Sequence, residues 1–246
     1  MIRLCESFNE LDFLPSNAFS ARITALFKTY GAGCDFALFW VQTVENIPVA
    51  ALSKVDGCIT LCHTEDADID ELRDFIGFCG CTELVCEKSV LDSLGFSAED
   101  SSVIVRFEKG RENIPLPENE NAEIKDFYEL LLRCGFNLGA FGAFASDVCA
   151  RLNKGTAKSV SISEGGKLCA CAVALFVGQK SVLLGAVGTS PEMRGRGYAS
   201  RLVEALAGFY SDKDVFLFCR NDSLVDFYGK FGFSPCGRWA VASFNN

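Results

Sequence analysis

The sequence lacks the features of several common functional classes. It has one histidine, His63, and none of its 13 cysteines form a C-x-x-C pair. Structural zinc sites usually show close ligand pairs at such spacing, so no metal site is expected. No apolar run reaches the roughly 18 residues that a membrane helix needs, and the N-terminus has no secretory pattern. We therefore expect no membrane association and a cytoplasmic location with reduced thiols.

Basic charge is also scarce. Lys and Arg total 23 against 32 Asp and Glu, a formal charge of −9. An acidic surface disfavours binding to nucleic acid, which is not an expected partner. Apolar residues are plentiful instead, at 49% of the chain against 22% charged, which suits a packed core. Most cysteines lie in apolar runs and are expected to act as small buried hydrophobic residues.

One segment has the composition of a linker. Residues 108–121, EKGRENIPLPENEN, hold two prolines and many polar side chains without an apolar period. This segment divides the 246 residues into parts of similar size, 1–115 and 116–246. The length admits one large domain or two small ones, at about 100–200 residues per domain.

The two parts end in the same pattern. Each closes with a strand, a short helix, a Gly-Phe-Ser turn and a last strand, and the intervals from Phe96 to Phe107 and from Phe233 to Phe244 are both 11 residues. An internal repeat of this length indicates two copies of one fold rather than a solenoid. The alternation of strands and helices predicts α/β (α+β) sheet domains.

The second copy keeps two features that the first lacks. The interval from Thr189 to Phe209 is 20 residues, that from Thr64 to Phe78 is 14, and the six missing residues fall where the second copy reads RGRGYA. The helix that carries DFYGKF in the second copy is four residues shorter in the first. At residues 65–74 the first copy has the acidic run EDADIDELRD, which would repel phosphate groups.

The stretch PEMRGRGYAS, residues 191–200, has the chemistry of a phosphate cradle. A helix start offers unpaired backbone N–H groups and the positive end of its dipole, and glycines let the backbone approach a ligand. Arg194, Arg196 and Arg201 add positive charge. The stretch is not a Walker loop and lacks the third glycine of GxGxxG. By itself it would also fit a basic turn that caps a helix.

In context, this stretch resembles the acetyl-coenzyme A motif of the GNAT acetyltransferase superfamily. The superfamily pattern, Arg/Gln-x-x-Gly-x-Gly/Ala, is met by Arg194, Gly197 and Ala199 after the strand-like run SVLLGAV. The later piece NDSLVDFYGKFGF is similar to a second superfamily pattern, with Asn221 and Tyr228 ahead of Gly-Phe. The resemblance covers the second half and is greatest to the glycine N-acyltransferase-like branch. The first half resembles the fold only through the repeat.

The resemblance implies two GNAT-like domains in tandem, each a mixed, mostly antiparallel sheet flanked by helices. Residues 1–115 would form a degenerate domain without the cofactor loop, and residues 116–246 the acetyltransferase domain. The implied reaction moves an acetyl group from acetyl-CoA, the co-substrate, to an amine of a small molecule or peptide by direct attack, without a metal. The expected assembly is a monomer or homodimer. Two alternatives stay open: a non-catalytic coenzyme A sensor, and a transferase for longer acyl-CoA donors.

The resemblance also implies roles for individual residues. Tyr228 stands at the general-acid position and would protonate the leaving thiolate. A backbone N–H near Val187 would stabilise the oxyanion, and the strand edge from there to Thr189 would pair with pantetheine. The expected cofactor-binding residues are Val187, Gly188, Thr189, Arg194, Gly195, Arg196, Gly197, Tyr198, Ala199, Ser200 and Asn221.

The general base and the acceptor are less defined. Many relatives place a glutamate on the strand before the loop, but VLLGAVG holds no carboxylate. Glu129, Asp147 and Glu164 are possible substitutes, ordered water could also serve, and nothing selects among them. An amine of low pKa would need no strong base. The family builds its acceptor pocket from the first two helices and their connection, here Arg133 to Phe144. The glycines and phenylalanines of this connection fit an apolar, compact acceptor.

Overall fold

The computed structural model describes residues 1–108, 115–117 and 122–244. Most of the linker expected at 108–121 therefore lies outside the described residues. Within the described ranges, no helix is both long and apolar enough to cross a membrane. The helices and strands are β1 (Ile2–Leu4), η1 (Phe8–Leu11), α1 (Ala18–Tyr30), β2 (Ala37–Val44), β3 (Ile47–Val55), β4 (Cys58–His63), α2 (Ile69–Phe78), β5 (Glu83–Glu87), α3 (Lys88–Ser93), β6 (Asp100–Phe107), α4 (Ile124–Arg133), α5 (Phe141–Asn153), β7 (Lys158–Glu164), β8 (Lys167–Val177), β9 (Ser181–Thr189), η2 (Pro191–Met193), α6 (Tyr198–Phe209), β10 (Asp214–Phe218), α7 (Asp222–Gly229) and β11 (Phe233–Ser243).

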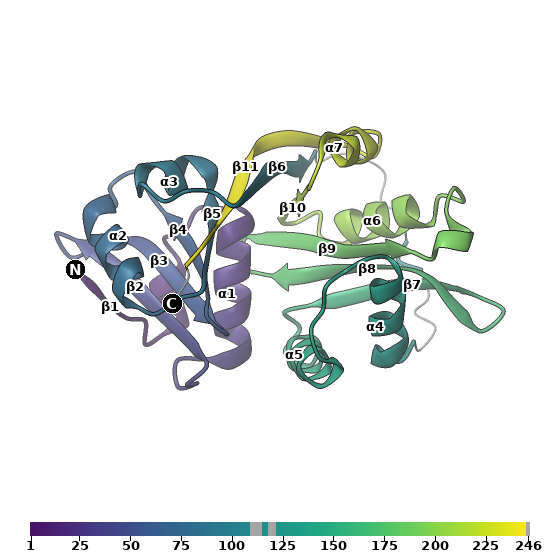
Figure 1. Cartoon of the computed structure of the whole chain (residues 1–246), viewed down its shortest axis with the longest axis horizontal. Helices are drawn as coiled ribbons and strands as arrows, with labels where there is room; N and C mark the ends of the chain where they lie inside the picture. The colour runs from purple at the N-terminus through teal and green to yellow at the C-terminus, as the bar shows by residue number, and fades with distance from the viewer. Residues whose placement is uncertain (109–114, 118–121, 245–246) are drawn as a thin grey trace.

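The strands form one continuous sheet with helices on both faces (Figure 1). Their order is β1-β2-β3-β4-β5-β11-β6-β10-β9-β8-β7. Among the described strands, only the pairs β4–β5 and β9–β10 are parallel. The expected mixed, mostly antiparallel α/β fold is therefore confirmed.

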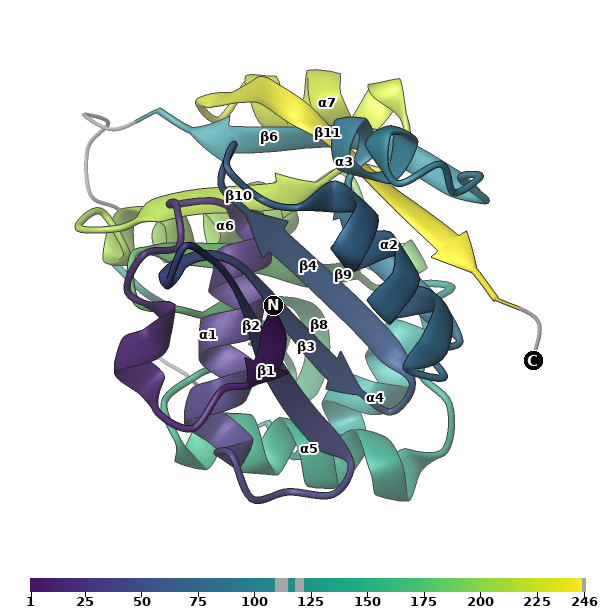
Figure 2. The same ribbon diagram turned by 90° about the vertical axis from the view of Figure 1, so that its left-hand side faces the viewer.

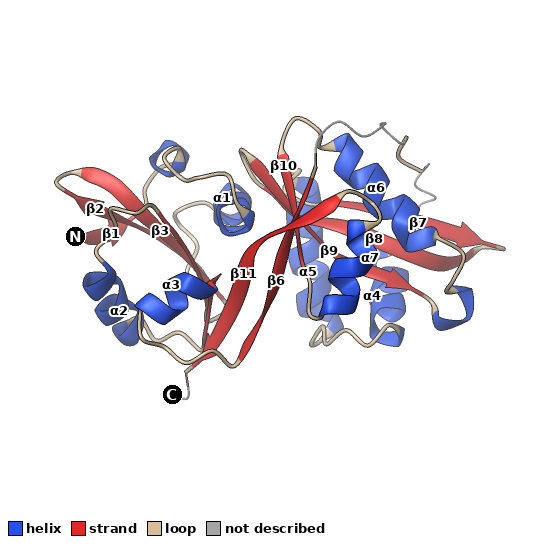
Figure 3. Cartoon of the chain, turned by 90° about the horizontal axis from the view of Figure 1, so that it is seen from above, coloured by secondary structure: helices blue, strands red, loops and turns tan. Residues whose placement is uncertain are grey.

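The two halves exchange their last strands at the centre of this sheet. β6, from the first half, pairs with β10 of the second, and β11 pairs with β5 of the first. β6 and β11 also pair with each other (Figure 3). The equal spacing of the phenylalanines follows from this arrangement, because the ring of Phe96 meets that of Phe244 and Phe107 meets Phe233, each pair 5.1 Å apart between centroids.

The exchange bears on the domain limits. The boundary between 1–115 and 116–246 remains a prediction. In the structure, each of these segments contributes one strand to the sheet of the other. A unit defined by sequence would therefore lack a strand that its own sheet needs.

Residues 1–115 produced alone should not give a folded monomer, because β5 and β6 would lose the strand that lies between them. Unpaired strand edges promote aggregation. Co-production with residues 116–246 should restore a soluble complex of the two segments, measured by size-exclusion chromatography and near-UV circular dichroism. A well-dispersed amide NMR spectrum from isolated 1–115 would contradict the observed exchange.

Helix α1 lies between the two halves (Figures 1 and 2). It covers one face of the first-half strands, while α2 and α3 cover the other. Its far side meets β8 and β9. The approach is close: a Cβ on Gly178 would stand 2.8 Å from Cα of Ala21, so only glycine fits there. The hydroxyls of Thr29 and Thr156, 2.6 Å apart, also join the halves.

In the second half, the helices lie on the two faces of β8 and β9. α6 packs on one face, where α7 continues the same apolar cluster over β6 and β11, and α4 with its neighbours packs on the other face. The apolar period of α6 explains its side: Leu202, Val203 and Leu206 are fully buried. All 13 cysteines are free thiols, and seven are buried, in keeping with their expected role as core residues.

Candidate active site

The site is organised by a divergence of two parallel strands. β10 pairs with β9 from Asp214–Ser181 to Leu217–Leu184 and no further. Beyond Leu184, β9 continues to Thr189 without a ladder partner on its β10 side among the described strands. Ala186 lies in this stretch with a φ of 47°, a left-handed value that is uncommon for alanine. Strained backbone of this kind clusters at functional sites.

A cleft of about 510 Å³ opens on the α6 side of this divergence. Val187 lines it from β9, and Tyr228 lines it from α7. Nine of the 11 expected cofactor residues line the cleft: Val187, Thr189, Arg194, Gly195, Arg196, Gly197, Tyr198, Ala199 and Ser200. Residues that are up to 41 positions apart in the sequence are thus brought to one surface.

The start of α6 leaves its backbone N–H groups open to the cleft. Gly197 is the N-cap residue, with a left-handed φ of 76°, and no side chain caps the helix there. A Cβ on Gly197 would meet no protein atom within 4 Å, so the space beside it is free for a ligand. Arg194 and Arg196 are exposed on the same loop. Open N–H groups, the positive end of the helix dipole and arginines form an anion site.

A carboxylate already neutralises part of this loop. Glu164, at the end of β7, pairs with the Arg196 guanidinium at 3.2 Å and accepts a hydrogen bond from the Tyr198 hydroxyl. The Arg196–Glu164 pair is about half exposed on both sides. Exposed ion pairs are weak, at about 0.2–1 kcal/mol, so a bound pyrophosphate can compete for Arg196.

The equivalent helix of the first half is closed to anions. The N-cap of α2 is Asp68, whose carboxylate accepts a hydrogen bond from the Glu71 N–H at 3.0 Å. Asp70 and Glu71 add negative charge to the first turn. The first copy therefore has acidic groups at the N-terminus of α2, whereas the second copy leaves the N-terminus of α6 open.

Tyr228 is a buried phenol at the wall of the cleft. It is 5% exposed, and its ring packs edge-on against Phe227 and Phe233. Burial raises the pKa of Tyr228 above the ordinary value of a phenol, and the neighbouring Cys219 thiol adds to the rise. Within the described part of the chain, its hydroxyl makes no hydrogen bond. The phenol is therefore protonated at physiological pH and free to donate to a ligand in the cleft.

Two expected cofactor residues lie off this surface. The side-chain oxygen of Asn221 caps α7 by accepting from the Leu224 N–H at 3.1 Å and from the Ser223 hydroxyl at 2.7 Å. Gly188 is buried against α4, where a Cβ would stand 3.2 Å from the Cys134 sulfur. A role for either residue toward a cofactor stays a prediction.

A second cavity, of about 470 Å³, lies on the other face of β9. Ala186 lines this cavity and packs among the apolar side chains of α4. The next residue, Val187, packs on the opposite face, among the apolar side chains of α6. The two cavities therefore lie on opposite faces of β9, beside the point where β9 and β10 diverge. From the expected acceptor segment 133–144, the lining residues are Phe136, Asn137, Leu138 and Phe144.

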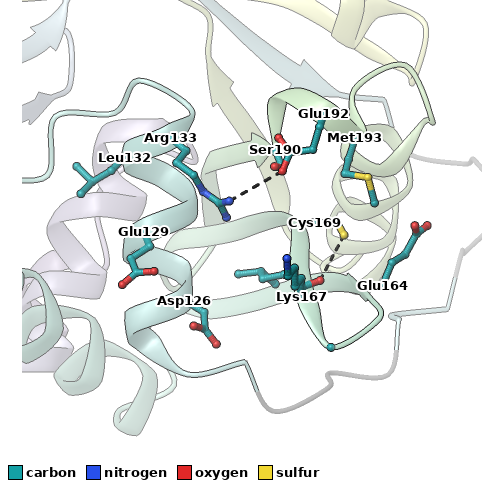
Figure 4. A pocket seen from close by; sticks show the side chains of 12 residues that line it. Asp126, Glu129, Leu132, Arg133, Glu164, Lys167, Cys169, Ser190, Glu192 and Met193 are labelled. Carbon is teal, nitrogen blue, oxygen red and sulfur yellow. Dashed lines mark hydrogen bonds and ion pairs between the residues drawn. The ribbon is translucent and has the colours of Figure 1, made fainter.

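The three candidate bases do not line the second cavity. Asp147 is engaged by the Tyr30 hydroxyl and by Arg151. Glu129 and Glu164 face a separate charged pocket between α4 and the β7–β8 turn, drawn in Figure 4. Of the described residues around the second cavity, none is acidic.

The sequence reasoning missed several lining residues. Leu224 and Phe227 line the cleft beside Tyr228. Leu224 stands four residues before Tyr228, a helical spacing that was a usable signal, and Phe227 is its neighbour in sequence. Arg151 and Arg220 line the second cavity, and no local pattern marked either one.

Comparisons with known proteins agree with this geometry. Residues 123–233 match the model of the Acetyltransferase (GNAT) family. A search of curated proteins gave no match. A GNAT-family acetyltransferase from Colwellia psychrerythraea is similar over 100% of both chains, at 15% identity and a TM-score of 0.57.

Two further solved structures have the same architecture. A tandem GNAT protein from the clavulanic acid biosynthesis pathway is similar over 98% of this chain and 97% of its own, at 12% identity and a TM-score of 0.59. A GCN5-related N-acetyltransferase from Sphaerobacter thermophilus is similar over 98% and 94%, at 13% identity and a TM-score of 0.55. At such identities the likeness concerns the fold, and it confirms the tandem arrangement. The family match over residues 123–233, joined to this fold and to the open helix start at Gly197, supports the GNAT acetyltransferase family for the second half of the chain.

Proposed function

We propose that the second half transfers an acetyl group from acetyl-CoA directly to an amine of a small molecule. The observation that carries this proposal is the placement of two cavities at adjacent residues of β9, Ala186 and Val187, one with an anion site and one with an apolar lining. Pyrophosphate would lie on the open N–H groups at the start of α6. Pantetheine would pair with the free edge of β9 and bring the thioester to the second cavity.

The residues of the chain support each step of direct transfer. A backbone N–H near Val187 would stabilise the oxyanion that forms when the amine attacks. Tyr228 would give its proton to the departing sulfur. The second cavity would hold the amine and is called the acceptor cavity below. Because none of its described lining residues is acidic, the amine must arrive neutral or lose its proton to water.

The test is release of thiol, with mass-spectrometric detection of the acylated product. The enzyme is mixed with acetyl-CoA and with longer acyl-CoA donors, each against a panel of amines and amino acids. Acetylated product supports the proposal, and preference for a longer donor would instead support the glycine N-acyltransferase-like reading. Tight coenzyme A binding with no product from any pair would support the sensor alternative.

Acetyl-CoA should bind with a stoichiometry of one per chain, measured by isothermal titration calorimetry. The reason is that Asp68 and the acidic first turn of α2 close the equivalent site in the first half. Substitution of Gly197 by Asp should abolish the titration signal. Two sites per chain, or one site that survives this substitution, would contradict the assignment.

A further inference from the structure

The acceptor cavity combines an apolar wall with two arginines. Phe127, Phe136 and Phe144 are among its lining residues, and its volume of about 470 Å³ lies in the usual range for small-molecule sites. Its only charged lining residues in the described chain are Arg151 and Arg220. Such a cavity favours a ligand that is largely apolar and carries one anionic group.

Arg151 is fixed in place by its neighbours. It is 8% exposed, pairs with Asp147 and donates from Nη1 to the Leu175 carbonyl at 3.1 Å. Its guanidinium also lies over the Phe176 ring, 5.0 Å from the centroid. Asp147 balances the charge, but the buried Nε has no hydrogen-bond partner among the described residues. Arg151 therefore gives the cavity a rigid polar side with little net charge.

Arg220 supplies the uncompensated charge. It is exposed, follows the end of β10 by two residues, and makes no ion pair or hydrogen bond with any other described residue. It lines the cavity together with Ala186, the neighbour of the expected oxyanion position at Val187. An anion held by Arg220 would thus lie close to the reacting carbonyl.

Resting on the proposed function, we propose that the acceptor is an apolar or aromatic α-amino acid. Its carboxylate pairs with Arg220, and its side chain enters the apolar cavity among Phe127, Phe136 and Phe144. Arginine suits this role because its planar guanidinium binds carboxylates in a bidentate manner. Since the anion lies close to the reacting carbonyl, the amine must be only a bond or two from the carboxylate, as in an α-amino acid.

The cavity also explains how the amine reacts without a carboxylate as general base. Burial in the apolar cavity disfavours an ammonium ion, and so lowers the pKa of the bound amine. The neutral amine nitrogen forms a bond to the acetyl carbon, and the C–S bond breaks. The amine loses one proton to water, Tyr228 gives one to the sulfur, and water returns a proton to Tyr228. The products are an N-acetyl amino acid and coenzyme A.

The test compares L-phenylalanine with phenethylamine, which lacks the carboxylate, on the wild-type chain and on Arg220→Met. We expect wild type to prefer phenylalanine, and Arg220→Met to raise KM for phenylalanine about 10–100-fold, the range for one hydrogen-bonded charge pair. Phenethylamine kinetics and coenzyme A affinity should not change. Arg238→Met is the matched control, because Arg238 is exposed and lines neither cavity.

Binding of L-phenylalanine to the complex with coenzyme A, measured by calorimetry, gives a readout that needs no turnover. If wild type binds phenylalanine and Arg220→Met does not, the inference is supported even when no product forms. The absence of product would then overturn only the proposed transfer. Equal use of phenylalanine and phenethylamine by wild type would overturn the inference and leave the transfer standing. Absence of phenylalanine binding, or a weaker coenzyme A affinity in Arg220→Met, would also overturn it.

Discussion

Replacement of Tyr228 by phenylalanine should lower kcat about 10²–10⁴-fold, with little change in affinity for acetyl-CoA. The hydroxyl makes no hydrogen bond within the described chain, so its loss leaves no partner unsatisfied. The ring contacts with Phe227 and Phe233 are kept. The variant should therefore fold as the wild type does, with a change in the free energy of unfolding below about 1 kcal/mol.

Tyr210→Phe is the matched control for this variant. Tyr210 is a second buried tyrosine of the same half, on the C-terminal side of α6, and burial raises its pKa to about 12. It lines neither cavity, so its loss of a hydroxyl should leave kcat unchanged. Single-turnover measurements ensure that the chemical step is observed. Equal rates for Tyr228→Phe and wild type would show that water or the substrate protonates the sulfur.

The raised pKa of Tyr228 predicts the form of the pH profile. A general acid acts only while it is protonated, and burial keeps the phenol protonated to a pH above its ordinary value of about 10. The kcat of wild type should consequently show no loss from ionisation of this group below about pH 10. A descending limb in kcat near pH 8 that disappears in Tyr228→Phe would contradict the raised pKa of this phenol.

Local features of the site could be predicted from the sequence. Gly197 and the arginines around it define a loop and a helix start within ten residues, and period and charge are enough to describe them. The loss of this loop in the first half was equally visible as a length difference. The acidic helix start at Asp68 then follows from residues that are adjacent in the chain.

The exchange of β6 and β11 could not be predicted. The two strands are equivalent copies, so the apolar pattern of each fits either half of the sheet. Periodicity identifies a strand but not its partner. The same limit applies to Arg151 and Arg220, which come to one cavity only through the packing of α5 and β10.

Asn221 shows how one pattern can have two physical meanings. It was expected to bind the cofactor because it stands at a motif position seven residues before Tyr228. In the structure its side chain caps α7, the ordinary role of an asparagine at a helix start. Capping fixes where α7 begins, and with it the position of Tyr228, so Asn221 supports the site through the helix.

Substitution of Gly197 by aspartate should weaken acetyl-CoA binding at least about 100-fold. The carboxylate would enter the open space at the start of α6, where the structure leaves N–H groups uncapped. A lost hydrogen bond to a charged group costs about 1.5–3 kcal/mol, and repulsion between the carboxylate and pyrophosphate adds to this. The change reproduces in the second half the aspartate that the first half has at Asp68.

Two matched variants separate the causes of that loss. Gly95→Asp places the same residue at the same φ of 76° in the first half, also in open space, and so reports the backbone strain of about 1–2 kcal/mol alone. Gly197→Asn adds the bulk without the charge and should lie between wild type and Gly197→Asp in affinity. The melting temperature should fall in all three variants, because each strains a glycine position. The calorimetric affinity for acetyl-CoA should fall only in the two variants of Gly197. Unchanged affinity in a folded Gly197→Asp variant would mean that the loop only begins a helix, and that the cofactor lies elsewhere.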